Sequence, residues 1–144
     1  MMGVIHLGDE IRDRLASALA DGCPVVAASV DGEGQPHISF FGTTQMYGPD
    51  QLALWVRNPD APFLQRLAGN DRIALLYRNG ADRVMYQFHG RGRPVGDEEV
   101  RVRVYDQSPA VERSMDPDCL GVAVLVDLDQ VRGRQHGEAF EMSR

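Results

Sequence analysis

The sequence predicts a mainly β fold of antiparallel strands with flanking short helices, an α+β arrangement. Apolar runs of strand length occupy residues 36–42, 51–57, 72–78 and 83–92. Turn residues separate them, at positions 47–50 and at Asn79-Gly80. A parallel pair needs a longer crossover than these gaps allow, so neighbouring runs are expected to pair antiparallel. One short helical segment interrupts this meander, which we expect to curl into a small barrel.

The overall composition limits the classes of function. The length of 144 residues predicts a single domain spanning 1–144. The net charge of -6 argues against binding a nucleic-acid backbone, which requires a basic face. No stretch approaches the ~20 apolar residues that cross a bilayer. Acidic residues follow the first methionines too closely for a signal peptide. We therefore expect a cytoplasmic protein with neither nucleic acid nor membrane as its partner.

The identity of the basic residues and the spacing of the cysteines and histidines argue against two kinds of site, a catalytic lysine and a metal site. All 15 basic residues are arginines, so a catalytic lysine is excluded. A bound anion would have to be held by arginine, backbone N–H groups or hydroxyls. Cys23 and Cys119 lack the spacing of a metal site and are expected to be free thiols. Because the histidines also lack such spacing, no metal site is predicted.

The first part of the chain predicts a helix followed by a hairpin. Residues 8–22 form an amphipathic pattern, with Ile11, Leu15 and Leu19 on one face. Residues 24–30 are an apolar strand, and Asp31-Gly32 indicates the hairpin turn after it. The strand 25–30 should pair with 37–42, and Thr43 and Thr44 are expected to continue that second strand.

The remaining elements follow from similar signals. Pro62 suits the first turn of the short helix, with Asp60 as its expected N-cap. The strand over 83–95 alternates cleanly, and Gly90 and Gly92 suggest a bulge or a close backbone approach. Residues 97–106 have both strand and helix features, and we choose the helix. A second short helix begins at 108, the last strand covers 120–132, and 135–144 is expected to fray.

The order of these elements resembles a known family. The segments GQPHISFFG, LALWVRN, RIALLY and GRGRPV follow one another, with a short helix after the second and GVAVLVDLDQVRGR near the end. This pattern resembles the pyridoxamine 5'-phosphate oxidase-like family, the flavin and deazaflavin (F420) reductase group. The resemblance implies a six-stranded antiparallel split β-barrel. It also implies a homodimer with FMN, or F420, in a groove between the subunits.

The resemblance also assigns cofactor-binding residues. The strand that lines the flavin ring would be His37, Ile38, Ser39, Phe40 and Phe41, followed by Trp55, Val56, Arg57 and Asn58, with Pro62 and Phe63 at the phosphate end. A helix N-terminus offers free N–H groups to a phosphate. No catalytic side chain is implied, because the cofactor carries the chemistry.

The chain departs from this pattern at the phosphate end. Relatives that hold a flavin phosphate usually carry a Ser-Arg-Lys-like triplet where this chain has Ala61-Pro62-Phe63. A lysine is often found where this chain has Gly42, and a polar residue is expected near Met85. Arg57 and the Asn58 amide are possible substitutes, since arginine binds phosphate with two parallel hydrogen bonds. We expect Phe63 to make this end of the groove more apolar.

Several of these residues also have a plainer interpretation. Trp55 lies among apolar strand residues, which is typical of a core or dimer-interface position. Phe40 and Phe41 must point to opposite faces, so one of them is expected in the core. Arg57 is equally compatible with a salt bridge, and His37 and His89 with ordinary barrel positions.

Three function classes remain open. The first is an oxidoreductase that uses FMN or F420 to reduce or oxidise a small molecule. The second is a haem-binding split barrel with His37, His89 or His136 as the iron ligand. The third is a non-catalytic binding or stress protein that has lost the contacts to the cofactor phosphate.

Overall fold

The structure is a computed structural model that describes residues 3–144. It confirms the mainly antiparallel architecture with short flanking helices. The elements in chain order are α1 (Asp9–Ser17), β1 (Val25–Val30), β2 (Pro36–Phe41), β3 (Gln45–Gly48), β4 (Gln51–Val56), α2 (Pro62–Gly69), β5 (Arg72–Asn79), β6 (Val84–Val95), α3 (Glu98–Gln107), α4 (Ala110–Ser114), β7 (Val122–Gln135) and β8 (Glu138–Ser143).

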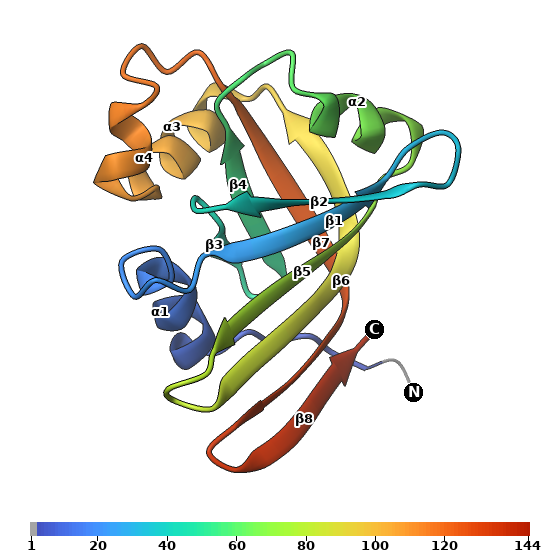
Figure 1. Cartoon of the computed structure of the whole chain (residues 1–144), viewed down its shortest axis with the longest axis vertical. Coiled ribbons are helices and arrows are strands. Elements are labelled where there is room, and N and C mark those ends of the chain that lie inside the picture. The colour runs from blue at the N-terminus through green and yellow to red at the C-terminus, as the bar shows by residue number, and fades with distance from the viewer. Residues whose placement is uncertain (1–2) are drawn as a thin grey trace.

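One antiparallel sheet contains all the strands. Its order is β2-β1-β5-β6-β7-β4-β3, and β8 pairs with β7 outside this path. Figure 1 shows α2 at the upper right of the curled sheet, α3 and α4 at the upper left, and α1 below them. The expectation of six strands is wrong, because the sheet of the described chain has 8 strands and is not closed. The two additional strands are β3 and β8.

The strand β3 was missed because β2 ends earlier than expected. Thr43 and Thr44 do not continue β2, since the chain turns after Phe41. The Thr44 hydroxyl donates to the Phe41 carbonyl at 2.8 Å, and the Thr44 N–H donates to the same oxygen at 3.2 Å. Such local bonds compete with the strand ladder. The chain therefore reverses at these threonines and again at Gly48, which leaves room for a four-residue strand between the turns.

The strand β8 corrects the expectation that residues 135–144 fray. Gln130–Gln135 of β7 pairs with Glu138–Ser143 through a two-residue turn. The turn residues His136 and Gly137 have φ values of 54° and 74°. Positive φ at both central residues is the geometry that tight hairpins require. Histidine is not among the residues preferred at the first position of such a turn, so this hairpin was not predicted.

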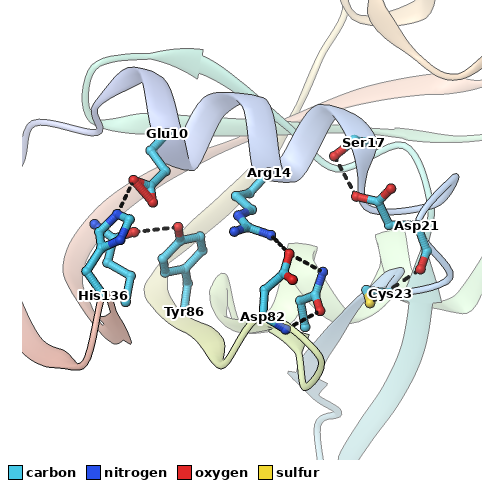
Figure 2. A network of polar contacts seen from close by, with 10 residues as sticks. Glu10, Arg14, Ser17, Asp21, Cys23, Asp82, Tyr86 and His136 are labelled. Atoms are coloured by element: carbon cyan, nitrogen blue, oxygen red, sulfur yellow. Dashed lines mark hydrogen bonds and ion pairs between the residues drawn. The ribbon is translucent and has the colours of Figure 1, made fainter.

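The helix α1 is shorter than the 8–22 span expected. Regular helix ends at Ser17, and turns lead to Gly22, whose φ is +74°. Ile11 and Leu15 are buried in the core as the periodicity predicted. Figure 2 shows polar contacts that connect the neighbouring face of the helix to two distant turns. Glu10 contacts His136 of the β7–β8 turn at 2.6 Å, and Arg14 contacts Asp82 of the β5–β6 turn.

The later helices largely follow the sequence signals. The choice of a helix over 97–106 is confirmed by α3, whose first turn is capped by Asp97 accepting from the Val100 N–H at 3.1 Å. Pro62 occupies the first turn of α2 as expected. The predicted cap by Asp60 is wrong, since the N-cap is Ala61, which makes no side-chain bond.

The sheet buries two apolar clusters, one on each side of β4 and β7. The main core packs the concave face of the sheet against α1 and α2, and includes Tyr77, Tyr86 and Phe88. The second cluster packs Trp55 and neighbouring strand residues under Val104 of α3. Because β4 is buried on both faces, its sequence is apolar at nearly every position. No helix among residues 3–144 is long and apolar enough to cross a membrane.

The strand β6 contains the irregularity that its glycines predicted. Its register with β7 shifts between His89 and Gly90. A Cβ on Gly90 would lie 2.3 Å from the carbonyl oxygen of Asp127, so only glycine fits there. The bulge increases the local twist, which bends the long strand around the core.

Candidate functional site

The ends of β2 and β4 border a cavity of about 390 Å³. Its walls come from the end of β2 and the turn after it, from the end of β4 and the loop that leads to α2, and from α4. The lining residues are Phe40, Phe41, Gly42, Thr43, Trp55, Val56, Arg57, Asn58, Ala61 and Glu112. The structure thus brings together six of the residues that the family resemblance assigned to a cofactor.

A reciprocal pair of hydrogen bonds fixes the two strand ends next to each other. The Thr43 hydroxyl donates to the Trp55 carbonyl at 3.0 Å and accepts from the Trp55 N–H at 2.9 Å. Thr43 is buried, and its hydroxyl satisfies both the N–H and the carbonyl of Trp55, as a neighbouring strand would. The β2–β3 turn is therefore anchored to β4, and the cavity opens beside this anchor.

The loop between β4 and α2 forms a tight turn at one end of the cavity. The Asn58 side-chain oxygen accepts from the Asp60 N–H at 2.9 Å, and the Ala61 N–H donates to the Asn58 carbonyl at 3.0 Å. The helix then begins at Pro62, which has no N–H group. This helix N-terminus consequently offers one donor fewer than usual, and Ala61 adds no hydroxyl.

Two charged side chains of opposite sign line the cavity. The Arg57 Nε lies 3.7 Å from the Glu112 Oε2, and a second guanidinium nitrogen contacts the sulfur of Met115. The side chain of Arg57 is 47% exposed, whereas that of Glu112 is only 16% exposed. A Cβ on Gly42 would lie 2.7 Å from the Glu112 Oε1. The absence of a side chain at Gly42 therefore leaves the space that the carboxylate occupies.

The two phenylalanines of β2 point to opposite faces, as predicted. Phe41 packs against Phe63 with ring centroids 4.6 Å apart and belongs to the edge of the main core. Phe40 is 71% exposed, which is unusual for a large aromatic residue. Phe40 thus presents an aromatic surface at the mouth of the cavity.

Trp55 has the core position of its plainer interpretation. It is 3% exposed, and its ring packs edge-on against Tyr105 at 5.3 Å. Its indole N–H donates to Asp116 Oδ2 at 2.9 Å. Burial opposes ionisation of Asp116, but hydrogen bonds from the Leu120 N–H, the indole and the Gly121 N–H outweigh it, so the pKa of Asp116 lies below its usual value. The indole is therefore committed to the fold and is not a stacking surface.

The other assigned residues lie away from the cavity walls. His37 contacts Asp31 of the hairpin turn at 2.9 Å, and Ile38 and Ser39 are exposed on β2. Pro62 is exposed at the start of α2. Phe63 is 5% exposed and lies in the main core, so it does not face the cavity.

The outer face of β1, β2 and β5 is apolar and partly hollow. Ile38 is 74% exposed, and Leu76 is also exposed. A second cavity of about 310 Å³ lies between these strands and is lined by Val26, Ala28, Ile38, Ala74, Leu75, Leu76, Gln87 and His89. Ala28 of β1 pairs with Ala74 of β5, and the small side chains of these two lining residues leave space for the cavity.

His89 differs from the other two candidate iron ligands. His37 and His136 each contact a carboxylate, whereas His89 forms no side-chain hydrogen bond with the described residues. Its Nδ1 atom is buried without a partner. His89 also borders a neighbouring cavity of about 410 Å³, which is lined in addition by Arg72 and Asp129. The imidazole therefore lies between two hollows of the outer face.

Comparison with protein families identifies the fold. The family model described as pyridoxamine 5'-phosphate oxidase matches residues 9–132. The chain belongs to this family. No curated protein matches the chain.

Several solved structures share this fold at low sequence identity. HupZ of Group A Streptococcus is 16% identical with a TM-score of 0.71, covering 93% of this chain and 98% of HupZ. A Clostridium acetobutylicum protein related to general stress protein 26 of B. subtilis is 13% identical with a TM-score of 0.65, covering 92% of this chain and 95% of that one. An FMN-binding protein of Syntrophomonas wolfei is 12% identical with a TM-score of 0.67, covering 86% of each chain.

Sequence reasoning missed some residues of the cavity wall. Thr43 was taken as strand, and its hydrogen bonds with Trp55 join residues that are 12 positions apart, so no local pattern indicates them. Glu112 lies on α4, far from Arg57 in the sequence, and no motif links the two. Only the folded chain brings Glu112 to the cavity.

Proposed function

We propose that the protein is a flavin- or deazaflavin-dependent oxidoreductase that binds FMN, or alternatively F420, in the cavity between the ends of β2 and β4. The observation that supports this most directly is the convergence of Phe40 and Arg57 on one cavity in a chain of this family. The cavity volume of about 390 Å³ falls in the range of small-molecule sites. We also propose that the protein works in the cytoplasm on a small-molecule substrate.

The residues of the cavity suit the ring system of such a cofactor. Phe40 offers an exposed aromatic surface on which a planar ring can stack. Arg57 is the cationic group available for an anion. When bound, the cofactor would accept and release a hydride, while the protein orients it and excludes water.

We further propose that a second copy of the chain covers the outer face of β2. Ile38 and Phe40 are mostly exposed there, beside the apolar cavity of about 310 Å³. Apolar surface of this kind marks interaction sites. Phe40 belongs both to this face and to the candidate cofactor cavity, so a partner that covers the face would also close the mouth of the cavity. A homodimer is therefore the arrangement we propose.

A cofactor titration tests the main proposal. FMN, F420 and haem are added separately to the cofactor-free protein, and binding is followed by flavin or deazaflavin fluorescence and by haem absorbance. We expect FMN or F420 to bind with loss of fluorescence. An Ala61→Phe variant should fill the cavity and abolish this binding, whereas Ala20→Phe, exposed on the turn after α1, should not. A protein that ignores all three cofactors would instead support the non-catalytic binding or stress function.

The isolated imidazole of His89 favours haem binding as a second candidate function. Because Nδ1 of His89 is buried, the iron ligand would be the other ring nitrogen, Nε2, which also has no hydrogen-bond partner among the described residues. The apolar lining around His89 suits a porphyrin, and Arg72 at the margin suits its acidic groups. Addition of haem should then produce a Soret band that is lost in His89→Ala and retained in His37→Ala. A Soret band unchanged in both variants would contradict a role for His89.

A further inference from the structure

The cavity between β2 and β4 contains one carboxylate that the proposed function does not use. Glu112 reaches it from α4, and its side chain is mostly buried. Among the described residues its carboxylate accepts no hydrogen bond, and its nearest cation is Arg57 at 3.7 Å. The carboxylate thus retains its capacity to accept hydrogen bonds and to repel an anion.

The charges of the cavity wall cancel. Arg57 is the cation of the lining and Glu112 is the anion, so the pair contributes no net positive potential. The α2 N-terminus does not make up the difference, because Pro62 lacks an N–H group and Ala61 lacks a hydroxyl. A phosphate monoester carries nearly two negative charges at neutral pH. The cavity therefore provides little net electrostatic attraction and few hydrogen-bond donors for a dianion.

We propose that Glu112 is a specificity-determining residue that makes the cavity discriminate against a phosphate group on the bound ring. The inference rests on the proposed function, because it concerns the same cavity. A ring with an uncharged side chain, as in riboflavin, should therefore bind at least as tightly as FMN. The repulsion acts across a partly buried space, where solvent screens charges less than at an open surface.

Two neighbours define the position of this carboxylate. Glu112 Oε1 lies only 2.7 Å from the position that a Cβ on Gly42 would take, and the Leu19 side chain also borders that position. The opposite oxygen faces Arg57. The carboxylate thus lies between the β2–β3 turn and the guanidinium, on the wall of the cavity.

The test compares two ligands in several variants. FMN and riboflavin have the same ring and differ in the phosphate, and their dissociation constants are measured by fluorescence titration at low salt. For Glu112→Gln we expect FMN to bind at least about fivefold more tightly while riboflavin changes by less than about twofold, because only FMN carries the extra charge. Glu112→Ser serves as a second variant if the glutamine variant is poorly folded. Glu99→Gln, exposed on α3, removes the same charge elsewhere and should change neither constant.

The possible outcomes separate the two proposals. If both flavins bind and Glu112→Gln leaves the FMN constant unchanged, the role of Glu112 is refuted while flavin binding stands. An equal gain in Glu112→Gln and Glu99→Gln would show an effect of net charge, and would also refute it. If neither flavin binds any variant, the FMN form of the proposed function fails, and the role of Glu112 fails with it.

Discussion

The indole N–H of Trp55 and the carboxylate of Asp116 form a buried hydrogen bond of 2.9 Å. Asp116 also accepts from the backbone N–H groups of Leu120 and Gly121, at 2.9 and 3.0 Å. One carboxylate therefore ties the end of β4 to the loop that enters β7. Since β4 carries the wall of the candidate cavity, this bond connects the stability of the fold to the shape of the site.

Replacement of Asp116 by asparagine should lower the free energy of unfolding by about 2 kcal/mol, because a charged acceptor with three donors is lost from a buried site. The change is measured by urea denaturation, followed by the fluorescence of Trp55, the single tryptophan of the chain. Asp118→Asn, two positions away and exposed, should have little effect. Equal stability of the two variants would show that the carboxylate does not organise this loop.

The same carboxylate should make stability depend on pH. The pKa of Asp116 is lowered in the folded protein, so its contribution to stability is complete above the ordinary aspartate pKa of about 3.9 and is lost as the pH falls through the folded value. The difference in unfolding free energy between the native chain and Asp116→Asn should therefore be full at pH 7 and shrink below about pH 4. Denaturation curves of the two proteins at pH 7 and at a pH below about 4 measure this difference in unfolding free energy. A difference that is constant with pH would contradict this assignment.

Gly90→Ala should destabilise the protein by at least about 2 kcal/mol, because the new Cβ meets rigid backbone in a packed region. That Cβ would lie 2.3 Å from the Asp127 carbonyl oxygen at the bulge of β6. Gly96→Ala is the matched control, since no atom lies within 4 Å of its Cβ. Thermal unfolding of the two variants gives the comparison. A fully stable Gly90→Ala would mean that β7 can move away at the bulge.

The strands with strong periodicity were predictable from the sequence, and the short ones were not. Val84, Tyr86 and Phe88 alternate because β6 buries one face, and this fixed both the strand and the direction of its side chains. The strand β3 depends on hydroxyl contacts of Thr43 and Thr44, which no periodicity records. The strand β8 depends on a turn whose first residue is not among those preferred for that geometry.

The candidate site was predictable only in part, for a related reason. Phe40 and Arg57 were assigned because the order of elements resembled a family, and they lie on the cavity wall. Phe63 was expected at the phosphate end, but a large apolar residue on a helix facing the sheet is drawn into the core. Glu112 was missed because its role depends on how α4 packs beside the β2–β3 turn, which is a tertiary contact.

Serine substitutions at Ile38 and Phe40 should convert the proposed dimer to a monomer, because they remove the most exposed apolar side chains of the β2 face. Light scattering after gel filtration measures the mass. Leu120→Ser, which is also exposed but lies before β7, should leave the mass unchanged. If the native chain is itself a monomer at high micromolar concentration, the proposal of a second copy on this face is wrong.

His136 provides a test of the β7–β8 turn. Its φ of 54° is unfavourable for most residues but is tolerated by asparagine, which commonly precedes glycine in such turns. Both His136→Asn and His136→Ala remove the contact with Glu10, so this exposed ion pair cancels from their comparison. The asparagine variant should be more stable than the alanine variant by about 1 kcal/mol, since alanine bears the cost of left-handed backbone. Thermal denaturation measures the difference. Equal stability of the two variants would mean that the hairpin of β7 and β8 does not use this turn.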